Sequence, residues 1–289
     1  MRKIRGLVIV FFIASCVCFG AYIGLKWLKT DLNEPELQFE DEKLSVSASA
    51  KEDALIAGVT AKDKEDGDLT NRIQVASMSP LLANNERTIE YVVFDDANNF
   101  ATASRTIAYK DYVPPRIYVK EPLRFVLNNY ENRLENLEME AVDMIDGDVT
   151  NRVRKSWGET SYLDKAGNYK FIFQVNNSAG DSCIVPVEIT IVDGANESGK
   201  YYPVLNDYIV YTSVGKELDM NDYLEGIQSG NVEYKFNSLD IPEGVSADSV
   251  TIRSYVNYEK PGVYKVIYAY MSADYVTAET TLYVVVEEK

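Results

Sequence analysis

Two short aspartate clusters are the residues of this 289-residue chain whose type and spacing suggest a chemistry. Residues 61–73 are AKDKEDGDLTNRI and residues 141–153 are AVDMIDGDVTNRV. Clustered carboxylates are ligands that Ca²⁺ prefers, and a glycine within the cluster permits a sharp turn. The spacing differs from that of an EF-hand loop, which has a longer run of ligands ending in Glu. One interpretation is therefore a Ca²⁺ site in each copy, with the carboxylates of Asp63, Asp66, Asp68, Asp143, Asp146 and Asp148 as candidate ligands.

The other interpretation of these clusters is a structural turn that needs no cofactor. Short Asp side chains accept hydrogen bonds from nearby backbone amides, and Gly67 or Gly147 can supply a positive φ. Arg72 and Arg152 occupy the same place in both copies and could neutralise the carboxylates without a metal. The pair Asp95-Asp96 is a further source of ligands in the first copy, whereas the second copy has Asn176-Asn177 there.

Composition argues against an enzyme. The chain contains no histidine, which removes the commonest general base and metal ligand, and too few cysteines remain for a zinc site. It has no G-x-S-x-G, Walker or dinucleotide-binding motif. A glycosidase needs a deep cleft between two carboxylates, which small tandem sandwiches rarely supply. We expect no catalytic activity.

Tyrosine is concentrated near the C-terminus, where residues 201–289 hold 13 of the 21 in the chain. Aromatic rings that lie near turns can stack on the faces of sugars. The alternative is that they pack across strands as part of the core. The candidates for glycan binding are Tyr201, Tyr202, Tyr208, Tyr211, Tyr255 and Tyr258.

The aspartate clusters belong to an internal repeat with an offset of 80 residues, the size of a small sandwich domain. Each copy continues with two β-rich runs around a polar turn, at 88–109 and at 167–192, which predicts a hairpin. The pattern A-x-D-x-x-D-G-D-x-T with this hairpin resembles a family of bacterial immunoglobulin-like repeats, known from pesticidal crystal proteins and Gram-positive surface proteins. The resemblance covers residues 34–112 and 113–193 and implies a β-sandwich and surface display, but no reaction.

Residues 201–289 lack the aspartate motif but have a similar hairpin, from Gly262 to Val286, which predicts a divergent third sandwich. The linker at Val113-Pro114-Pro115 is expected to be stiff, and the linker at 194–199 (GANESG) is expected to flex. The predicted fold class is all-β: tandem immunoglobulin-like β-sandwiches preceded by one N-terminal transmembrane helix.

The apolar N-terminal segment predicts a membrane anchor. Residues 6–25 contain no charge and as a helix would span about 30 Å. Arg2, Lys3 and Arg5 favour a cytoplasmic N-terminus by the positive-inside rule. We therefore expect a cytoplasmic tail at 1–5, a transmembrane anchor at 6–27 and extracellular domains. The alternative is a lipoprotein, because residues 13–16 (IASC) resemble a lipobox that would make Cys16 a lipidated N-terminus.

The acidic charge of the rest of the chain suits an extracellular segment or one that binds cations. Without the five basic residues of the first 30, 24 basic and 45 acidic residues remain, a net charge of about −21 that repels nucleic acid. Cys183 stands alone in this region, and an external location without disulfides favours a bacterium. The predicted function is a membrane-anchored bacterial cell-surface protein whose immunoglobulin-like domains serve adhesion or protein–protein interaction. The alternative is a module that binds cell-wall or host polysaccharide through the tyrosines of the third domain.

Overall fold

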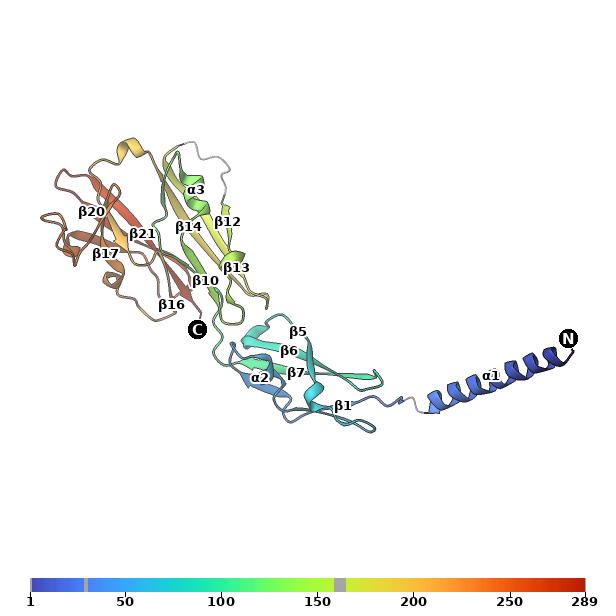
Figure 1. The fold of residues 1–289 in the computed structure, drawn as a ribbon. Helices are drawn as coiled ribbons and strands as arrows, with labels where there is room; N and C mark the ends of the chain where they lie inside the picture. The colour runs from blue at the N-terminus through green and yellow to red at the C-terminus, as the bar shows by residue number, and fades with distance from the viewer. Residues whose placement is uncertain (1, 29–30, 159–164, 289) are drawn as a thin grey trace. The chain divides into compact units, whose positions relative to one another are not determined.

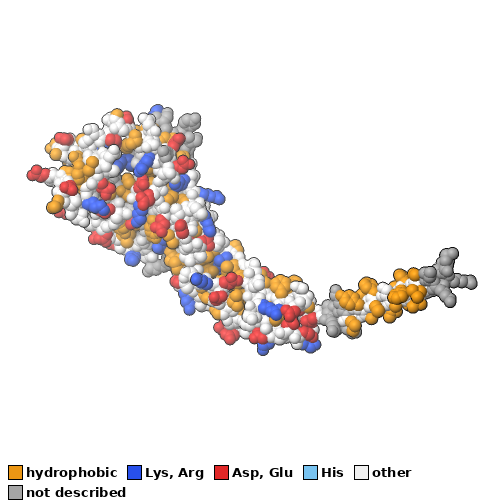
Figure 2. Space-filling model, in the orientation of Figure 1, with side chains coloured by type: hydrophobic (Ala, Val, Ile, Leu, Met, Phe, Trp, Pro, Cys, Tyr) orange, Lys and Arg blue, Asp and Glu red, His pale blue; other side chains and the backbone are white. Residues whose placement is uncertain are grey.

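The computed structural model describes residues 2–28, 31–158 and 165–288 (Figure 1). The chain forms two compact units, residues 1–112 and 113–289. The first unit opens with the helix α1 (Arg2–Leu28). Within this helix, Gly6–Leu25 is uncharged and none of it is buried against the rest of the protein. Figure 2 shows hydrophobic side chains over the surface of the helix. The apolar helix that the sequence predicts is therefore present.

The rest of the first unit is a β-sandwich with one three-stranded and one four-stranded sheet. The three-stranded sheet has the order β1-β3-β4 and the four-stranded sheet has the order β2-β7-β6-β5. The strands are β1 (Glu36–Phe39), β2 (Lys43–Val46), β3 (Val59–Asp63), β4 (Gly67–Asp68), β5 (Gln74–Met78), β6 (Glu86–Phe94) and β7 (Phe100–Tyr109). The short helices between them are α2 (Glu52–Ile56), η1 (Thr70–Arg72) and η2 (Ala83–Asn85).

The second sandwich repeats this arrangement, with sheet orders β11-β10-β8 and β12-β13-β14-β9. Its strands are β8 (Arg116–Val119), β9 (Arg124–Val126), β10 (Met139–Asp143), β11 (Gly147–Asp148), β12 (Arg154–Trp157), β13 (Gly167–Asn176) and β14 (Ser182–Val192). Its short helices are α3 (Tyr130–Glu135) and η3 (Thr150–Arg152), and η4 (Gly194–Asn196) follows it.

The third sandwich has the same sheet plan without the aspartate motif, with orders β15-β17-β18 and β16-β21-β20-β19. Its strands are β15 (Tyr202–Leu205), β16 (Ile209–Ser213), β17 (Leu224–Ser229), β18 (Val232–Lys235), β19 (Val250–Ser254), β20 (Gly262–Met271) and β21 (Thr277–Glu287). Two short helices, η5 (Met220–Tyr223) and η6 (Ala247–Ser249), connect them. The all-β class with tandem sandwiches is confirmed.

All three sandwiches share one unusual pairing. The second strand of each sandwich lies parallel to the last one: β2 with β7, β9 with β14 and β16 with β21. Every other strand pair is antiparallel among the described residues. Within the strands, alternate side chains are buried, as β6 shows with Ile89, Tyr91 and Val93 fully enclosed. This alternation is the period of two that the hairpins predict.

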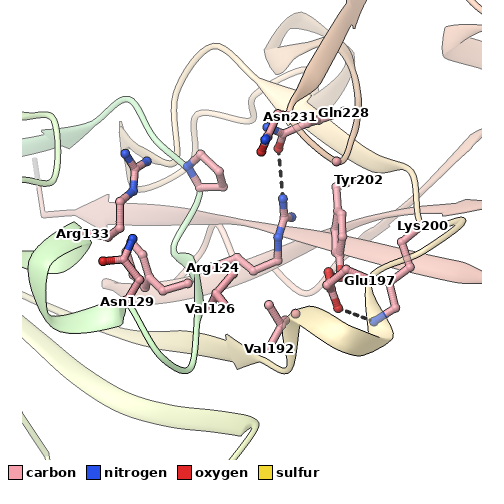
Figure 3. A pocket seen from close by; sticks show the side chains of 14 residues that line it. Arg124, Val126, Asn129, Arg133, Val192, Glu197, Lys200, Tyr202, Gln228 and Asn231 are labelled. Atoms are coloured by element: carbon pink, nitrogen blue, oxygen red, sulfur yellow. Dashed lines mark hydrogen bonds and ion pairs between the residues drawn. The ribbon is translucent and has the colours of Figure 1, made fainter.

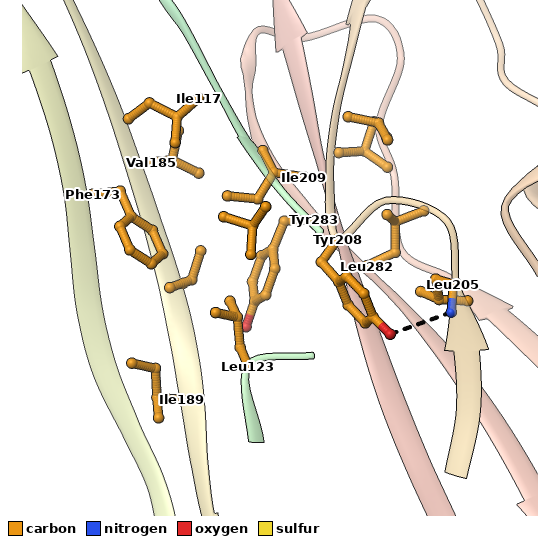
Figure 4. Close-up of a cluster of buried hydrophobic side chains, with 14 of the residues drawn as sticks. Ile117, Leu123, Phe173, Val185, Ile189, Leu205, Tyr208, Ile209, Leu282 and Tyr283 are labelled. Carbon is orange, nitrogen blue, oxygen red and sulfur yellow. Dashed lines mark hydrogen bonds between the residues drawn. The ribbon is translucent and has the colours of Figure 1, made fainter. Parts of the chain in front are cut away.

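The second and third sandwiches pack against each other through a shared apolar core (Figure 4). The side chains of Phe173, Val185 and Ile189 from one sandwich lie in the same cluster as Ile209 and Leu282 from the other. The amide of Tyr208 also donates to the carbonyl of Val119 at 2.9 Å. Burial of both apolar faces holds the pair together. The expectation that residues 194–199 form a flexible joint is therefore wrong, since both sandwiches belong to one compact unit.

Candidate functional site

The first aspartate of each repeat holds the tight turn between two strands. Asp63 Oδ1 accepts hydrogen bonds from the amides of Glu65 and Asp66, at 2.8 and 2.9 Å. These amides, that of Asp66 foremost, lower the pKa of the Asp63 carboxyl. Asp143 Oδ1 accepts two equivalent bonds in the second copy, both at 2.8 Å. Gly67 and Gly147 sit at φ 78° and 72°, the left-handed conformation that glycine adopts most easily.

The remaining aspartates of the motif face other partners. Asp68 and Asp148 each accept a bond from the amide two residues on, at 3.0 and 2.9 Å, and are exposed. Asp66 Oδ2 accepts from the amide of Asp96 at 2.7 Å. Asp146 takes the same place in the second copy, where it accepts from the amide of Ser178 and pairs with Arg152. All six candidate ligands thus have turn or ion-pair roles.

Asp63 differs from the others because it faces two more carboxylates. Asp31, Asp63 and Asp95 each offer an oxygen within 4.8 Å of the other two. Asp63 and Asp95 are 8% and 5% exposed. Asp95 lies in the turn after β6. Asp31 precedes β1, and the pairing of β1 with β3 brings this part of the chain close to Asp63: Glu36, the first residue of β1, pairs with Lys62. The sequence placed Asp63 and Asp95 among possible ligands but gave no sign of Asp31, which lies 32 residues before Asp63.

Two oxygens of this trio have no hydrogen-bond partner within the part of the chain that the structure describes. They are Asp31 Oδ2 and Asp63 Oδ2, and both are buried. By contrast, Asp95 accepts from the amide and the side-chain Nδ2 of Asn99, each at 2.7 Å. Asn99 Nδ2 also donates to the carbonyl of Asp31 at 3.2 Å. A buried carboxylate oxygen without a donor loses its hydration uncompensated.

The second copy closes the same position with an amide. Asn177, 7% exposed, donates from Nδ2 to Oδ2 of Asp143 at 3.0 Å, so this oxygen is satisfied. The strand register pairs Phe94 with Phe100 and Asn176 with Ser182, which aligns Asp95 with Asn177. The sequence alignment of Asp95-Asp96 with Asn176-Asn177 is therefore shifted by one residue, and Asp96 corresponds to Ser178.

A groove of about 510 Å³ lies where the second and third sandwiches meet (Figure 3). Arg124, on β9, crosses it and donates to Gln228 at 3.0 Å while its guanidinium lies 3.3 Å from the ring centre of Tyr202. Burial lowers the pKa of the Arg124 guanidinium. Arg133 and Lys200 also line the groove, each already paired, with Glu121 and Glu197. Among the described residues no ion pair joins Arg124 to a carboxylate.

Most of the tyrosines proposed for glycan binding serve the junction or the core. Tyr202 and Tyr208 are 9% and 1% exposed, so the expectation that their rings are free is wrong. Tyr201 is half-buried against Tyr270, and the hydroxyl of Tyr258 accepts from the amide of Leu218. Tyr255 is 62% exposed and keeps an accessible ring.

Two tyrosines of the third sandwich satisfy backbone groups of the second. The hydroxyl of Tyr211 accepts from the amide of Ile117 at 2.7 Å and donates to its carbonyl at 3.0 Å. The hydroxyl of Tyr283 does the same for Glu188, at 2.6 and 3.2 Å. Tyr211 also lies 3.5 Å from the buried thiol of Cys183, whose pKa burial raises. Tyr211 is thus a structural residue of the junction.

No family model matches the chain, and no curated protein matches it. Among solved structures, it is similar to the carbohydrate-binding module and INT domains of Clostridium perfringens ZmpB, solved with GlcNAc, at 20% identity and a TM-score of 0.22. That match covers 52% of this chain and 26% of the other. A second ZmpB structure, with the M60 catalytic domain, is 13% identical with a TM-score of 0.21, and the match covers 88% of this chain and 31% of that one. Repeats EC21–23 of human CDH23 are 12% identical, with a TM-score of 0.20 and coverage of 88% and 100%. These similarities are too distant to assign a family or a function.

Proposed function

We propose that the chain is a single-pass membrane protein that displays its β-sandwiches outside a bacterial cell, where they bind a partner protein. The observation that carries this proposal is the helix α1. Its 20 uncharged residues have a mean hydropathy of 2.4, and none of that stretch is buried against the sandwiches. Large apolar side chains such as Phe11 and Phe12 are 71% and 69% exposed. A bilayer offers such a surface the apolar surroundings that water does not.

The anchor is tested by expressing the full chain in a bacterium and separating the membranes. We expect the protein in the membrane fraction at its full mass, with the sandwiches cleaved by protease added to intact cells. A variant without residues 2–28 should leave the membrane fraction. Cleavage before Cys16, abolished by Cys16→Ser, would instead establish the lipoprotein. Full-length protein in the soluble fraction would refute both forms of tether.

The groove between the second and third sandwiches is the proposed contact for the partner. The guanidinium of Arg124 is partly desolvated there by burial, and its neighbours are the side-chain amide of Gln228 and the ring of Tyr202. A carboxylate from a partner would form the charge-assisted hydrogen bonds that this guanidinium lacks within the described chain. The second and third sandwiches both line this groove, and they pack against each other through the shared apolar core.

A polysaccharide is the second candidate, since Asn129, Gln228 and Asn231 place amide groups in the same groove and Tyr255 remains exposed. The test compares the full chain in detergent with Arg124→Gln and Tyr255→Ala in pull-downs on purified cell wall and on solubilised surface proteins. Capture of a surface protein that fails only with Arg124→Gln supports the protein partner. Wall binding that fails with Tyr255→Ala supports the polysaccharide, and binding indifferent to both variants removes both sites.

A further inference from the structure

We infer that Asp31, Asp63 and Asp95 form a Ca²⁺ site in the first sandwich, and that the second sandwich carries a metal-free version of it. The inference concerns the first unit alone and does not depend on the proposed partner or on the groove. It differs from the interpretation suggested by the aspartate motif, because only Asp63 of that motif takes part.

The geometry fits one ion. Ca²⁺ takes oxygen ligands at about 2.3–2.6 Å, so two oxygens on opposite sides of the ion stand about 4.6–5.2 Å apart. The three carboxylates bring their oxygens within 4.8 Å of one another, which is inside that limit. Three monodentate carboxylates leave further positions for carbonyl oxygens or water, as is usual for this cation.

The negative charges of the three carboxylates also favour a bound cation. Three carboxylates repel one another at this separation, and the described chain gives none of them a Lys or Arg partner within ion-pair distance. Asp63 is more than nine-tenths buried, and its Oδ2 has no donor among the described residues. Asp31 is only half-buried, but its Oδ2 atom is also enclosed and has no donor among the described residues. A divalent ion would neutralise the repulsion and satisfy both oxygens at once.

The internal repeat supplies an independent comparison. In the second sandwich, Asn177 stands at the place of Asp95 and donates to Asp143, the counterpart of Asp63. Because Asn177 is uncharged and donates from its amide, Asp143 Oδ2 is satisfied without a metal. In the first sandwich the carboxylate of Asp95 occupies this position, and it cannot supply the donor that the amide supplies.

Bound Ca²⁺ would tie the start of the chain outside the helix to the sandwich. Asp31 lies three residues after the last residue of α1, and the structure links its segment to the sandwich by the 2.9 Å bond between Asn33 and Glu65 and by the Asn99 contact. A cation would add a much stronger link at the same place. Ca²⁺ should therefore slow amide exchange in residues 31–34.

The test uses the full chain in detergent, stripped with a chelator and titrated with CaCl₂ by calorimetry. We expect a single site, with affinity lowered at least about tenfold by Asp95→Asn and by Asp31→Asn. Asp95→Asn recreates the amide of the second copy, so it should fold normally. Asp31 precedes the first strand, so its replacement leaves the sandwich intact. The matched control is Asp96→Asn, which removes one charge from the neighbouring, 70% exposed side chain and should retain the affinity.

Three results would overturn the inference. The first is the absence of Ca²⁺ binding by the unmodified chain. The second is an equal loss in Asp96→Asn and Asp95→Asn, which would show only a diffuse attraction to an acidic surface. The third is binding without a change of exchange in residues 31–34, which would remove Asp31 from the site and with it the proposed set of ligands. A titration with MgCl₂ alongside should give weaker binding, because Mg²⁺ needs a tighter octahedron.

Discussion

Replacement of Tyr211 by Phe should loosen the junction between the second and third sandwiches while leaving its packing unchanged. The ring stays in place, because its contacts with Tyr118 at 5.5 Å and with the Arg116 guanidinium at 5.1 Å do not involve the hydroxyl. What disappears is the pair of hydrogen bonds to Ile117, a residue with no exposed surface, and the weaker 3.5 Å contact with the Cys183 thiol. The sheet cannot replace them, since β8 is an edge strand.

The size of the effect follows from what is left unsatisfied. A buried donor or acceptor without a partner costs about 1–3 kcal/mol, so the orphaned amide and carbonyl of Ile117 together should cost about 2–3 kcal/mol after some relaxation. The local opening that exposes the Ile117 amide becomes easier by the same amount. Its hydrogen exchange should therefore accelerate about 30- to 150-fold, at tenfold for each 1.4 kcal/mol.

The assay is native-state hydrogen exchange on the full chain, resolved at Ile117, with urea unfolding of the same samples. Tyr283→Phe should produce the same acceleration at Glu188. The matched control is Tyr264→Phe, whose exposed hydroxyl donates only to the carbonyl of Lys260, and it should change stability by no more than about 0.5 kcal/mol. If Tyr211→Phe folds and Ile117 keeps its protection, the hydroxyl does not hold the junction and the reasoning is refuted.

Three other outcomes can be measured on the same protein. Asn177→Asp should destabilise the second sandwich by about 3 kcal/mol near neutral pH, because it sets a second buried carboxylate against Asp143. Urea unfolding of the variant tests this, and unchanged stability would contradict it. Burial raises the pKa of Tyr208 from 10.0 to about 12, so above pH 10 this tyrosine ionises in the unfolded chain before it ionises in the folded one. The free energy of unfolding should therefore fall by up to about 1.4 kcal/mol per pH unit from this residue, and tyrosinate absorbance should rise cooperatively with unfolding. A free energy of unfolding that stays constant above pH 10 would contradict that cause. Gly226→Ala should cost about 2 kcal/mol, because its Cβ would clash with the carbonyl oxygen of Tyr234 on the paired strand, and normal thermal unfolding would contradict the clash.

The repeated motif made much of the fold predictable from the sequence. Its turns and the hairpins β6–β7 and β13–β14 lie where the spacing placed them, because tight turns and alternating burial are local properties. The third sandwich followed from a hairpin of the same kind, β20–β21. The apolar helix was equally plain, since its signal is a single uninterrupted run.

Contacts between distant residues were the part that the sequence could not supply. Asp31 joins Asp63 only because β1 pairs with β3, and no spacing rule links residues 32 positions apart. The junction was missed for a similar reason: tyrosines that look like exposed rings in the sequence lie against the neighbouring sandwich. The linker at 194–199 suggested flexibility by composition, but the packing on either side overrides it.

The parallel pairing in each sandwich has a mechanical consequence. The second strand of a sandwich lies near its entry and the last strand at its exit, and the two run side by side in the same direction, as β2 and β7 do from Lys43↔Thr106 to Val46↔Tyr109. A pull on the two ends of the sandwich therefore loads these hydrogen bonds in shear. All of them must yield together, whereas an antiparallel hairpin pulled from its open end would unzip one bond at a time. A chain tethered at one end and gripped at the other would be strongest along the direction in which it is stretched.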